Sequence, residues 1–301
     1  MNIKKNGKVR NGGNILIDTV VYILSFLIAV VTVYPFLNVL ALSLNDYIDT
    51  VKGGIYIFPR KFTLQNYLYV LQNKFLLTGL KNSVLRTVLG TGFSLICSTM
   101  LAYTLSRRDF IARKFFSVLV IITMYVGGGL IPDYLLIMNL KLSNSFWVYI
   151  FPMLLSAWNV FILRSFIEGI PGALEEAAIV DGANDLTIFF RVILPLCTPA
   201  LATIGLYCAV GQWNAWFDTY MYNFFDRSLT TLQYELMKIL RESQTDSIME
   251  DVLAGSESAA RVSPESIKMA ITIIVTLPIV CVYPFIQKFF VKGVTLGAVK
   301  S

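Results

Sequence analysis

The sequence predicts an all-α protein that crosses a membrane several times. Of its 301 residues, 56% are hydrophobic and only 15% are charged, whereas soluble domains average about 25% charged residues. The mean hydropathy is +0.66. Several apolar runs reach the length of about 20 residues that a helix needs to cross the hydrocarbon core of a bilayer. Helices are expected because a lipid-exposed segment must satisfy its backbone hydrogen bonds internally.

Six long runs without charged residues predict six membrane spans. Their approximate bounds are residues 19–45, 87–106, 115–132, 142–163, 196–217 and 269–287. No charged residue lies deep inside the last five runs. Because proton- and voltage-driven machines usually carry ionisable residues within the membrane, we expect the energy source to lie outside this chain. The chain also lacks the GxxxxGK[ST] phosphate loop, so any ATP must bind to another polypeptide.

Basic residues next to the spans predict the orientation, since such clusters mark the cytoplasmic side. They gather before the first span, between the second and third spans, and after the sixth: Lys4, Lys5, Lys8 and Arg10; Arg107, Arg108, Arg113 and Lys114; Lys288, Lys292 and Lys300. We therefore expect a membrane domain over residues 15–295, with cytoplasmic ends 1–14 and 288–301, in a bacterial inner or plasma membrane. The first span is read as uncleaved because its apolar run exceeds that of a signal peptide.

Glycine and proline predict an interruption of the third span. The run Gly127-Gly128-Gly129 is followed by Pro132, and both residue types end helices. We expect a short interfacial helix over Tyr134–Leu140 on the outer side.

The residue inventory excludes several classes of protein. Histidine is absent and the four cysteines lie in or beside apolar runs, which excludes Ser–His and Cys–His nucleophile pairs and disfavours a disulfide framework. We expect no catalytic residue, no metal site and no cofactor in this chain. The net charge of +6 is distributed between apolar blocks, which suits membrane lipid headgroups and not nucleic acid.

The stretch between the fourth and fifth spans, residues 165–195, predicts two short helices. Gly182 can adopt the left-handed conformation that ends a first helix. Asn184 or Asp185 can then cap a second helix over Leu186–Leu194. On local grounds alone this is an amphipathic helical hairpin on the cytoplasmic side.

The residues of this stretch resemble the EAA loop of ABC importer permeases. The pattern comprises Glu176-Ala177-Ala178, Asp181-Gly182-Ala183 and the ending Ile193-Leu194-Pro195. In that family the loop forms coupling helices that sit in a cleft of the ATPase subunit, which implies a coupling role for Glu176, Ala177, Ala178, Asp181, Gly182 and Ala183. The resemblance covers most of the chain and is closest to the maltose-type carbohydrate branch, in particular the permeases for complex oligosaccharides.

The resemblance also implies the function and the partners. The chain is expected to be the permease subunit of a binding-protein-dependent importer for a carbohydrate, an oligosaccharide in particular. The expected partners are a second permease subunit in a heterodimer, two ATPase subunits that bind ATP and Mg, an extracellular solute-binding protein and membrane lipid. Three alternatives stay open: a permease for amino acids or another small solute, an ion-coupled secondary transporter, and a membrane scaffold that transports nothing.

Amides and aromatic rings at the outer end of the fifth span predict part of the substrate path. The residues are Gln212, Trp213, Asn214, Trp216 and Tyr220, with Tyr207, Phe217, Tyr222 and Asn223 nearby. Aromatic faces can stack on sugar rings, and amides can bond sugar hydroxyls; an aromatic belt at the lipid interface is the alternative. On a continuous helix, positions 212 and 216 share a face and 213 and 214 turn away, so we expect only one of these pairs to be sensitive to substitution.

Overall fold

The computed structural model describes residues 12–241 and 264–298, and the described part of the chain is predominantly helical. No strand occurs within these residues; one isolated bridge pairs Asn45 with Phe62. The chain forms two compact units, residues 1–70 with 255–273 and residues 71–254 with 274–301. The predicted all-α class is confirmed. The predicted cytoplasmic ends, 1–14 and 288–301, lie partly outside the described residues.

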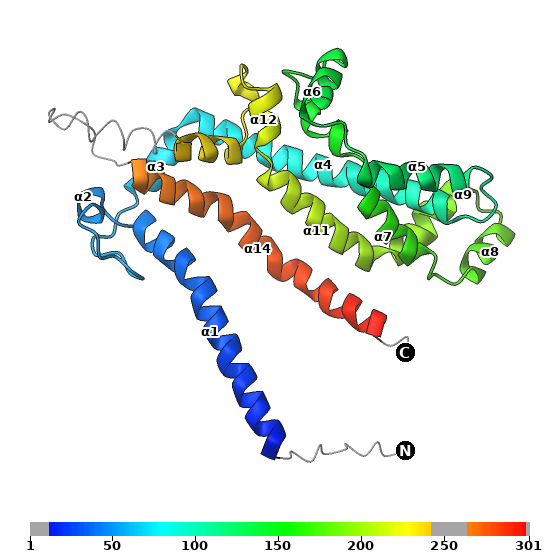
Figure 1. The fold of residues 1–301 in the computed structure, drawn as a ribbon, viewed down its shortest axis with the longest axis horizontal. Coiled ribbons are helices and arrows are strands. Elements are labelled where there is room, and N and C mark those ends of the chain that lie inside the picture. Colours follow the sequence, from blue (N-terminus) through cyan, green and yellow to red (C-terminus); the bar gives the residue numbers. More distant parts are fainter. Residues whose placement is uncertain (1–11, 242–263, 299–301) are drawn as a thin grey trace. The chain divides into compact units, whose positions relative to one another are not determined.

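Most of the helices are labelled in Figure 1. They are α1 (Gly12–Ser43), α2 (Tyr47–Thr50), α3 (Gln65–Gln72), α4 (Lys74–Ser106), α5 (Arg113–Tyr125), α6 (Leu130–Asn139), η1 (Phe146–Tyr149), η2 (Phe151–Met153), α7 (Ala157–Ile167), α8 (Ala173–Val180), α9 (Asp185–Ile188), η3 (Phe189–Ile193), α10 (Leu194–Leu196), α11 (Thr198–Asn214), α12 (Phe217–Tyr222), η4 (Arg227–Leu229) and α14 (Pro264–Ala298). Residues 232–241 are also helical.

Three of these helices are long and apolar enough to cross a membrane: Ile17–Ser43, Lys74–Ser106 and Glu265–Pro284. Three bent pairs pass the same test together: Arg113–Tyr125 with Leu130–Asn139 at 120°, Phe146–Met153 with Ala157–Ile167 at 50°, and Asp185–Leu196 with Thr198–Asn214 at 81°. Counting each bent pair as one span gives six. The number of spans in the membrane stays a prediction.

The helix that contains the predicted second span begins before that span. Helix α4 starts at Lys74, not at Thr87, because the side chain of Asn73 accepts hydrogen bonds from the backbone N–H groups of Phe75 and Leu76. The helix therefore contains Arg86, which is fully buried. Arg86 directly precedes the predicted span 87–106, and its guanidinium has protein partners that replace water.

The three bent segments depart from single straight helices at identifiable residues. The predicted interruption at Gly127–Gly129 is confirmed, with α5 ending at Tyr125 and α6 beginning at Leu130. The fourth segment starts as two 3-10 turns, and the side chain of Ser145 caps the first of them. The predicted second helix of the 165–195 stretch continues through a π-helical turn to Leu196, and α11 follows with Pro199 in its first turn. Proline lacks the N–H that would continue the ladder, so the axis turns there.

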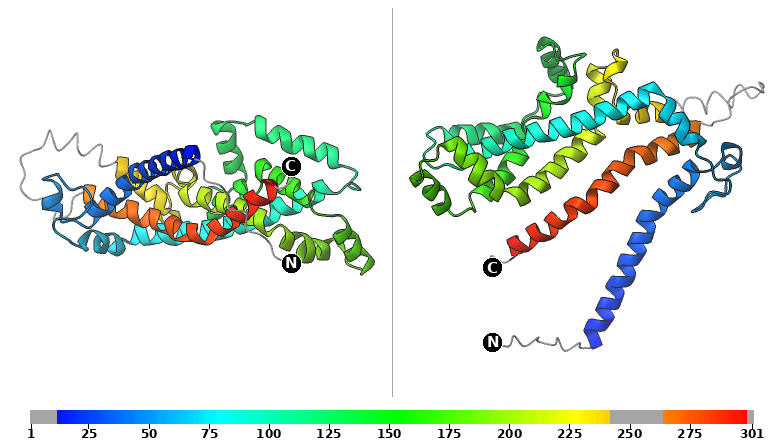
Figure 2. Two further views of the ribbon diagram at one scale, coloured as in Figure 1. Left: turned by 90° about the horizontal axis from the view of Figure 1, so that it is seen from below. Right: turned by 180° about the vertical axis from the view of Figure 1, so that it is seen from behind.

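The core of the second unit lies where α4, α7 and α11 pack together (Figures 1 and 2). Its fully or nearly fully buried members include Ala102, Leu105, Val160, Leu163, Ile188, Phe189, Ile193, Cys197 and Ile204. These residues come from α4, α7, the α9–η3 turn and α11, apart from Cys197, which directly precedes α11. The stretch between the fourth and fifth segments is thus packed onto the same core as the long helices.

The first unit is organised around buried polar side chains that follow α1. The Asn66 side chain donates hydrogen bonds to the backbone oxygens of Ser43 and Asn45, at 2.9 and 3.2 Å. Arg60 forms an ion pair with Asp49 at 3.0 Å. In contrast, none of the most apolar 18-residue window of α1 is buried by the residues that the structure describes. We infer that lipid or another subunit covers it.

Candidate functional site

A cavity of about 600 Å³ lies in the second unit between α4, α5, α7, α11 and the η2 turn. Its volume falls in the range of about 300–1,000 Å³ that is usual for small-molecule sites. The lining residues that carry polar or aromatic groups are Ser94, Thr123, Ser156, Trp158, Asn159 and Gln212. No charged side chain occurs among the residues that line this cavity. Its chemistry is therefore that of neutral donors and acceptors beside an aromatic ring.

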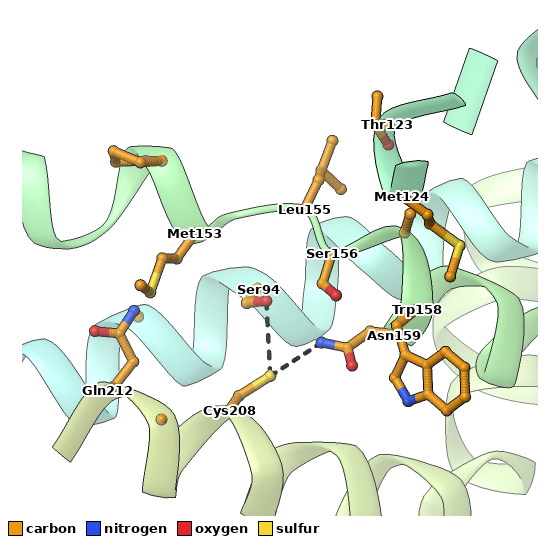
Figure 3. Close-up of a pocket in the computed structure, with 14 residues that line it drawn as sticks. Ser94, Thr123, Met124, Met153, Leu155, Ser156, Trp158, Asn159, Cys208 and Gln212 are labelled. Atoms are coloured by element: carbon orange, nitrogen blue, oxygen red, sulfur yellow. Dashed lines mark hydrogen bonds between the residues drawn. The ribbon is translucent and has the colours of Figure 1, made fainter. Parts of the chain in front are cut away.

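Three side chains from three helices meet in the cavity (Figure 3). The Asn159 Nδ2 group donates to Cys208 Sγ at 3.3 Å, and Ser94 Oγ lies 3.8 Å from the same sulfur. A thiol is a weak hydrogen-bonding partner. The hydroxyl and the amide are therefore only weakly satisfied by the protein, and both can bond a polar ligand.

Gln212, at one end of the cavity, is held by the protein. Its Oε1 atom accepts a hydrogen bond from Arg86 Nε at 3.1 Å, and its Nε2 atom donates to the backbone oxygen of Tyr149 at 3.1 Å. Gly90, one turn after Arg86 on α4, makes room for this side chain, because a Cβ atom there would lie 2.6 Å from Gln212 Nε2. The amide therefore has a defined orientation in the cavity wall.

Arg86 itself is surrounded by partners. Its Nη1 atom donates to the backbone oxygen of Ala215 at 3.2 Å and to Asp218 Oδ1 at 3.1 Å. Nη2 donates to the other carboxylate oxygen of Asp218, and the guanidinium carbon lies 4.4 Å from the centre of the Tyr149 ring. This network joins α4 to η1, to the end of α11 and to α12.

Of the five residues predicted for the substrate path, only Gln212 lines the cavity. Trp213 is buried, and its Nε1 group donates to the backbone oxygen of Val275 at 2.9 Å. Asn214 is exposed, and Trp216 and Tyr220 contact the Arg241 guanidinium at 5.2 and 5.6 Å. Positions 212 and 216 do not share one continuous helical face, because α11 ends at Asn214 and Ala215 is extended; the pairing expected for a continuous helix therefore does not apply here.

Sequence reasoning missed Ser94, Trp158, Asn159 and Cys208. An amide inside an otherwise apolar run was the available signal, because a polar group within a span needs a partner or a function. Asn159 lies inside the predicted fourth span and met that criterion. Ser94 and Cys208 carry no such signal, since small residues of this kind are common in membrane helices.

The 165–195 stretch forms a short helix, a glycine turn and a second helix. As predicted, Gly182 has a positive φ of 82°. Asn184 caps α9, its side chain accepting from the Thr187 backbone N–H. The six residues of the EAA pattern divide into two groups. Ala178 and Ala183 pack against the core, whereas Glu176, Ala177, Asp181 and Gly182 are exposed.

Exposed apolar side chains accompany those polar ones on α8. Leu174, Ile179 and Val180 are 45%, 50% and 86% exposed. A helix of this length with three uncovered aliphatic side chains presents a surface that a protein partner can bury. In Figure 1, α8 stands at the Ser106 end of α4, while α12 stands nearer the Lys74 end.

A polar cavity among helices that can cross a membrane, with a helical hairpin at one end, defines a membrane component of a transport system. The chain matches the family described as binding-protein-dependent transport system inner membrane component over residues 1–296, and it belongs to that family. The predicted family is confirmed, and with it the role of a membrane subunit that catalyses no reaction itself.

Two curated proteins and one solved structure illustrate the relationship. The chain is 39% identical over 288 residues to the polygalacturonan/rhamnogalacturonan transport system permease protein YtcP of Bacillus subtilis, covering 96% of this chain and 99% of that protein. It is 29% identical to the arabinooligosaccharides transport system permease protein AraQ of Halalkalibacterium halodurans, covering 91% and 93%. A chain of a bacterial ABC transporter involved in the import of the acidic polysaccharide alginate superposes with a TM-score of 0.84 at 28% identity, covering 94% and 100%.

Proposed function

We propose that this chain is a permease subunit of an ABC importer and that its cavity forms one wall of the path taken by an oligosaccharide. The observation that carries the proposal is the cavity of Ser94, Trp158, Asn159 and Cys208 in a chain whose relatives are named for oligosaccharide and polysaccharide transport. Hydroxyl and amide groups can exchange hydrogen bonds with sugar hydroxyls, and the indole ring of Trp158 offers an apolar face.

The energy for transport would come from partner subunits that hold ATP and Mg. The EAA loop, residues 165–195, would dock on an ATPase subunit in the cytoplasm through the exposed face of α8. Leu174 and Val180 supply apolar area for such a contact, and Glu176 supplies a charge without a hydrogen-bond partner among the described residues. A second permease subunit would complete the path and cover part of the apolar surface of α1. An extracellular binding protein would deliver the solute.

Substrate protection of Cys208 tests the path directly. A chain that retains Cys208 but has alanine at Cys97, Cys197 and Cys281 should react with a small thiol reagent. A transported oligosaccharide should slow that reaction at least several-fold. The matched control retains Cys97, which is partly exposed on α4 but does not line the cavity, and its labelling should not respond to sugar. Labelling of Cys208 that ignores every oligosaccharide transported by the complex would remove this cavity from the path.

Uptake by variants tests the class of substrate. Asn159→Ala and Ser94→Ala should each lower oligosaccharide uptake several-fold at equal membrane levels, because one lost hydrogen bond costs about 0.5–1.5 kcal/mol. The assay compares labelled oligosaccharides with amino acids in vesicles that contain the whole complex. Uptake of amino acids but not of sugars would show that the substrate is an amino acid and not an oligosaccharide. Uptake that an uncoupler abolishes and ATP depletion does not would indicate an ion-coupled transporter.

A further inference from the structure

Two adjacent glutamates of the EAA loop have different environments. The Oε1 atom of Glu175 accepts hydrogen bonds from the Tyr103 hydroxyl at 2.8 Å and from Arg107 Nη1 at 2.6 Å. The Glu175 side chain is only 27% exposed. Glu176 is exposed and has no hydrogen bond or ion pair among the residues that the structure describes. The loop therefore directs one carboxylate toward its own subunit and leaves the next one available to a partner.

Arg107 connects the loop to the end of α4. Besides Glu175, its Nη1 atom donates to Asp185 Oδ1 at 3.0 Å, and its Nη2 atom donates to Asp109 Oδ2 at 2.8 Å. It also lies beside the Tyr103 hydroxyl, at 3.1 Å from Nη1. One guanidinium thus joins α4, the link that follows it, α8 and α9. The hydrogen bond from Arg107 holds the pKa of Asp109 below its ordinary value.

The charge balance makes Arg107 hard to replace. Three carboxylates converge on it, and they would repel one another without a cation between them. Arg108, the next residue, is exposed and has no hydrogen bond or ion pair among the described residues. Arg113 is already paired with Glu168 at 2.7 Å. A network of several charges around a partly buried arginine contributes more than an isolated surface pair.

The rest of the loop does not depend on this contact for its position in the fold. Ala178 and Ala183 pack against the core, and Ile188 and Phe189 are buried in it. At the start of the loop, Glu168 accepts from both Arg113 and Arg164. Removal of the Arg107 network should therefore leave the loop folded, while its rigid connection to α4 is lost.

Helix α4, which ends at Ser106 next to Arg107, runs without a break to the cavity, where Ser94 and Gly90 lie in the wall. We propose that Arg107 is a positioning residue that makes the EAA loop and α4 move together, so that a displacement of the loop reaches the cavity wall. Glu175 anchors the loop within the subunit, and Glu176 faces the ATPase. This inference rests on the proposed docking of the loop on an ATPase subunit.

The experiment uses the complete complex, with its ATPase and binding protein, in sealed vesicles. Two quantities are measured for each variant: the ATPase that copurifies with the permease, and the ATP hydrolysed per solute imported. Arg107→Gln and Glu175→Gln should keep the ATPase at normal stoichiometry and raise the ATP used per solute about fivefold or more, the lower end of typical coupling effects. Arg107→Lys should use an amount of ATP per solute between that of the unchanged protein and that of Arg107→Gln, because an ammonium group keeps the charge but cannot reproduce the guanidinium fork.

Arg108→Gln is the matched control, since it removes the same charge one residue away, and its ATP-to-solute ratio should be normal. A normal ATP-to-solute ratio in Arg107→Gln would overturn the inference. Loss of the ATPase from that complex would also overturn it, because Arg107 would then act in docking the ATPase and not in positioning the loop. If Arg107→Gln does not reach the membrane, the ATP-to-solute ratio of Glu175→Gln tests the inference instead, because glutamine removes the ion pair with Arg107 without changing the size of the side chain. The docking on which the inference rests is tested separately: Glu176→Lys should lose ATPase, and its retention would overturn both proposals.

Discussion

Arg86 shows what a charged residue needs in order to be buried in a helix that is long and apolar enough to cross a membrane. The guanidinium is completely buried, and the carboxylate of Asp218 lies against it. Desolvation makes such a pair a weak source of net stability, but removal of one partner leaves an uncompensated buried charge. The pair is therefore better understood as fixing the positions of Gln212 and the α11–α12 turn than as a source of stabilisation.

Removal of the carboxylate tests this view. Asp218→Asn should destabilise the chain by about 3–5 kcal/mol, because Arg86 then stays buried without a counterion. The double variant Arg86→Met with Asp218→Asn should recover a large part of that loss. The measurement is unfolding in detergent, with Lys81→Gln, an exposed cation on the same helix, as the control. Equal stability of Asp218→Asn and Lys81→Gln would show that the ion pair is unimportant to the fold.

Gly90 provides a second prediction at the scale of single residues. In Gly90→Ala the new methyl group would meet Gln212 Nε2 at 2.6 Å and Cδ at 2.8 Å, and the amide cannot move without losing Arg86 or Tyr149. We expect a loss of about 1–3 kcal/mol, as for other overpacked sites. Gly92→Ala is the control, because its methyl group would meet nothing within 4 Å. Gln212→Ala should relieve the clash in a double-mutant cycle, and additive losses would contradict the contact.

At the scale of elements, substitutions at the glycine turn of the 165–195 stretch can distinguish backbone strain within the chain from a clash with a partner subunit. Gly182 has a φ of 82°, and a Cβ there would meet nothing within 4 Å. Gly182→Ala should cost only the left-handed backbone strain of about 1–2 kcal/mol. Gly182→Leu should stay in the membrane yet abolish solute-stimulated ATP hydrolysis, because the larger side chain would occupy space needed by the docked ATPase.

The control for this prediction lies in the same loop. Gly172 has a φ of −60° and open space around it, so Gly172→Ala should fold and couple normally. The readout is the ATPase rate of the purified complex with and without loaded binding protein. Normal stimulation in Gly182→Leu would show that the turn does not approach the ATPase.

At the scale of the whole molecule, the orientation of the chain in the membrane is the principal open prediction. The α4–α5 link carries the basic cluster and exposes Ile111, whereas Phe225 is exposed in the segment predicted to lie outside. In a background without native cysteines, Ile111→Cys should react with a membrane-impermeant thiol reagent only from the cytoplasm, and Phe225→Cys only from the outside. Reaction of both from one side would require an even number of crossings between them and would overturn the six-span topology.

Local sequence features determined much of this protein. Long charge-free runs favour helices that can cross a membrane, since lipid imposes internal backbone hydrogen bonding. The break at Gly127–Gly129 and the turn at Gly182 follow from backbone preferences that act within a few residues. The EAA pattern was sufficient to indicate the family. The bounds of α4 were harder to predict, because Arg86 looks like the end of a span unless its distant partner is known.

The tertiary structure alone decided which side chains share a cavity and which carboxylate of the 165–195 stretch has no partner among the described residues. Ser94, Asn159 and Cys208 belong to three helices, and the rotation and bend of each helix determine whether they meet. Gln212 proved to be held by Arg86, 126 positions earlier. Glu175 and Glu176 are adjacent and chemically identical, and only the packing of α8 beside the end of α4 brings Glu175, and not Glu176, into an ion pair with Arg107. Such assignments depend on contacts between distant segments, and hydropathy and local propensity do not encode these contacts.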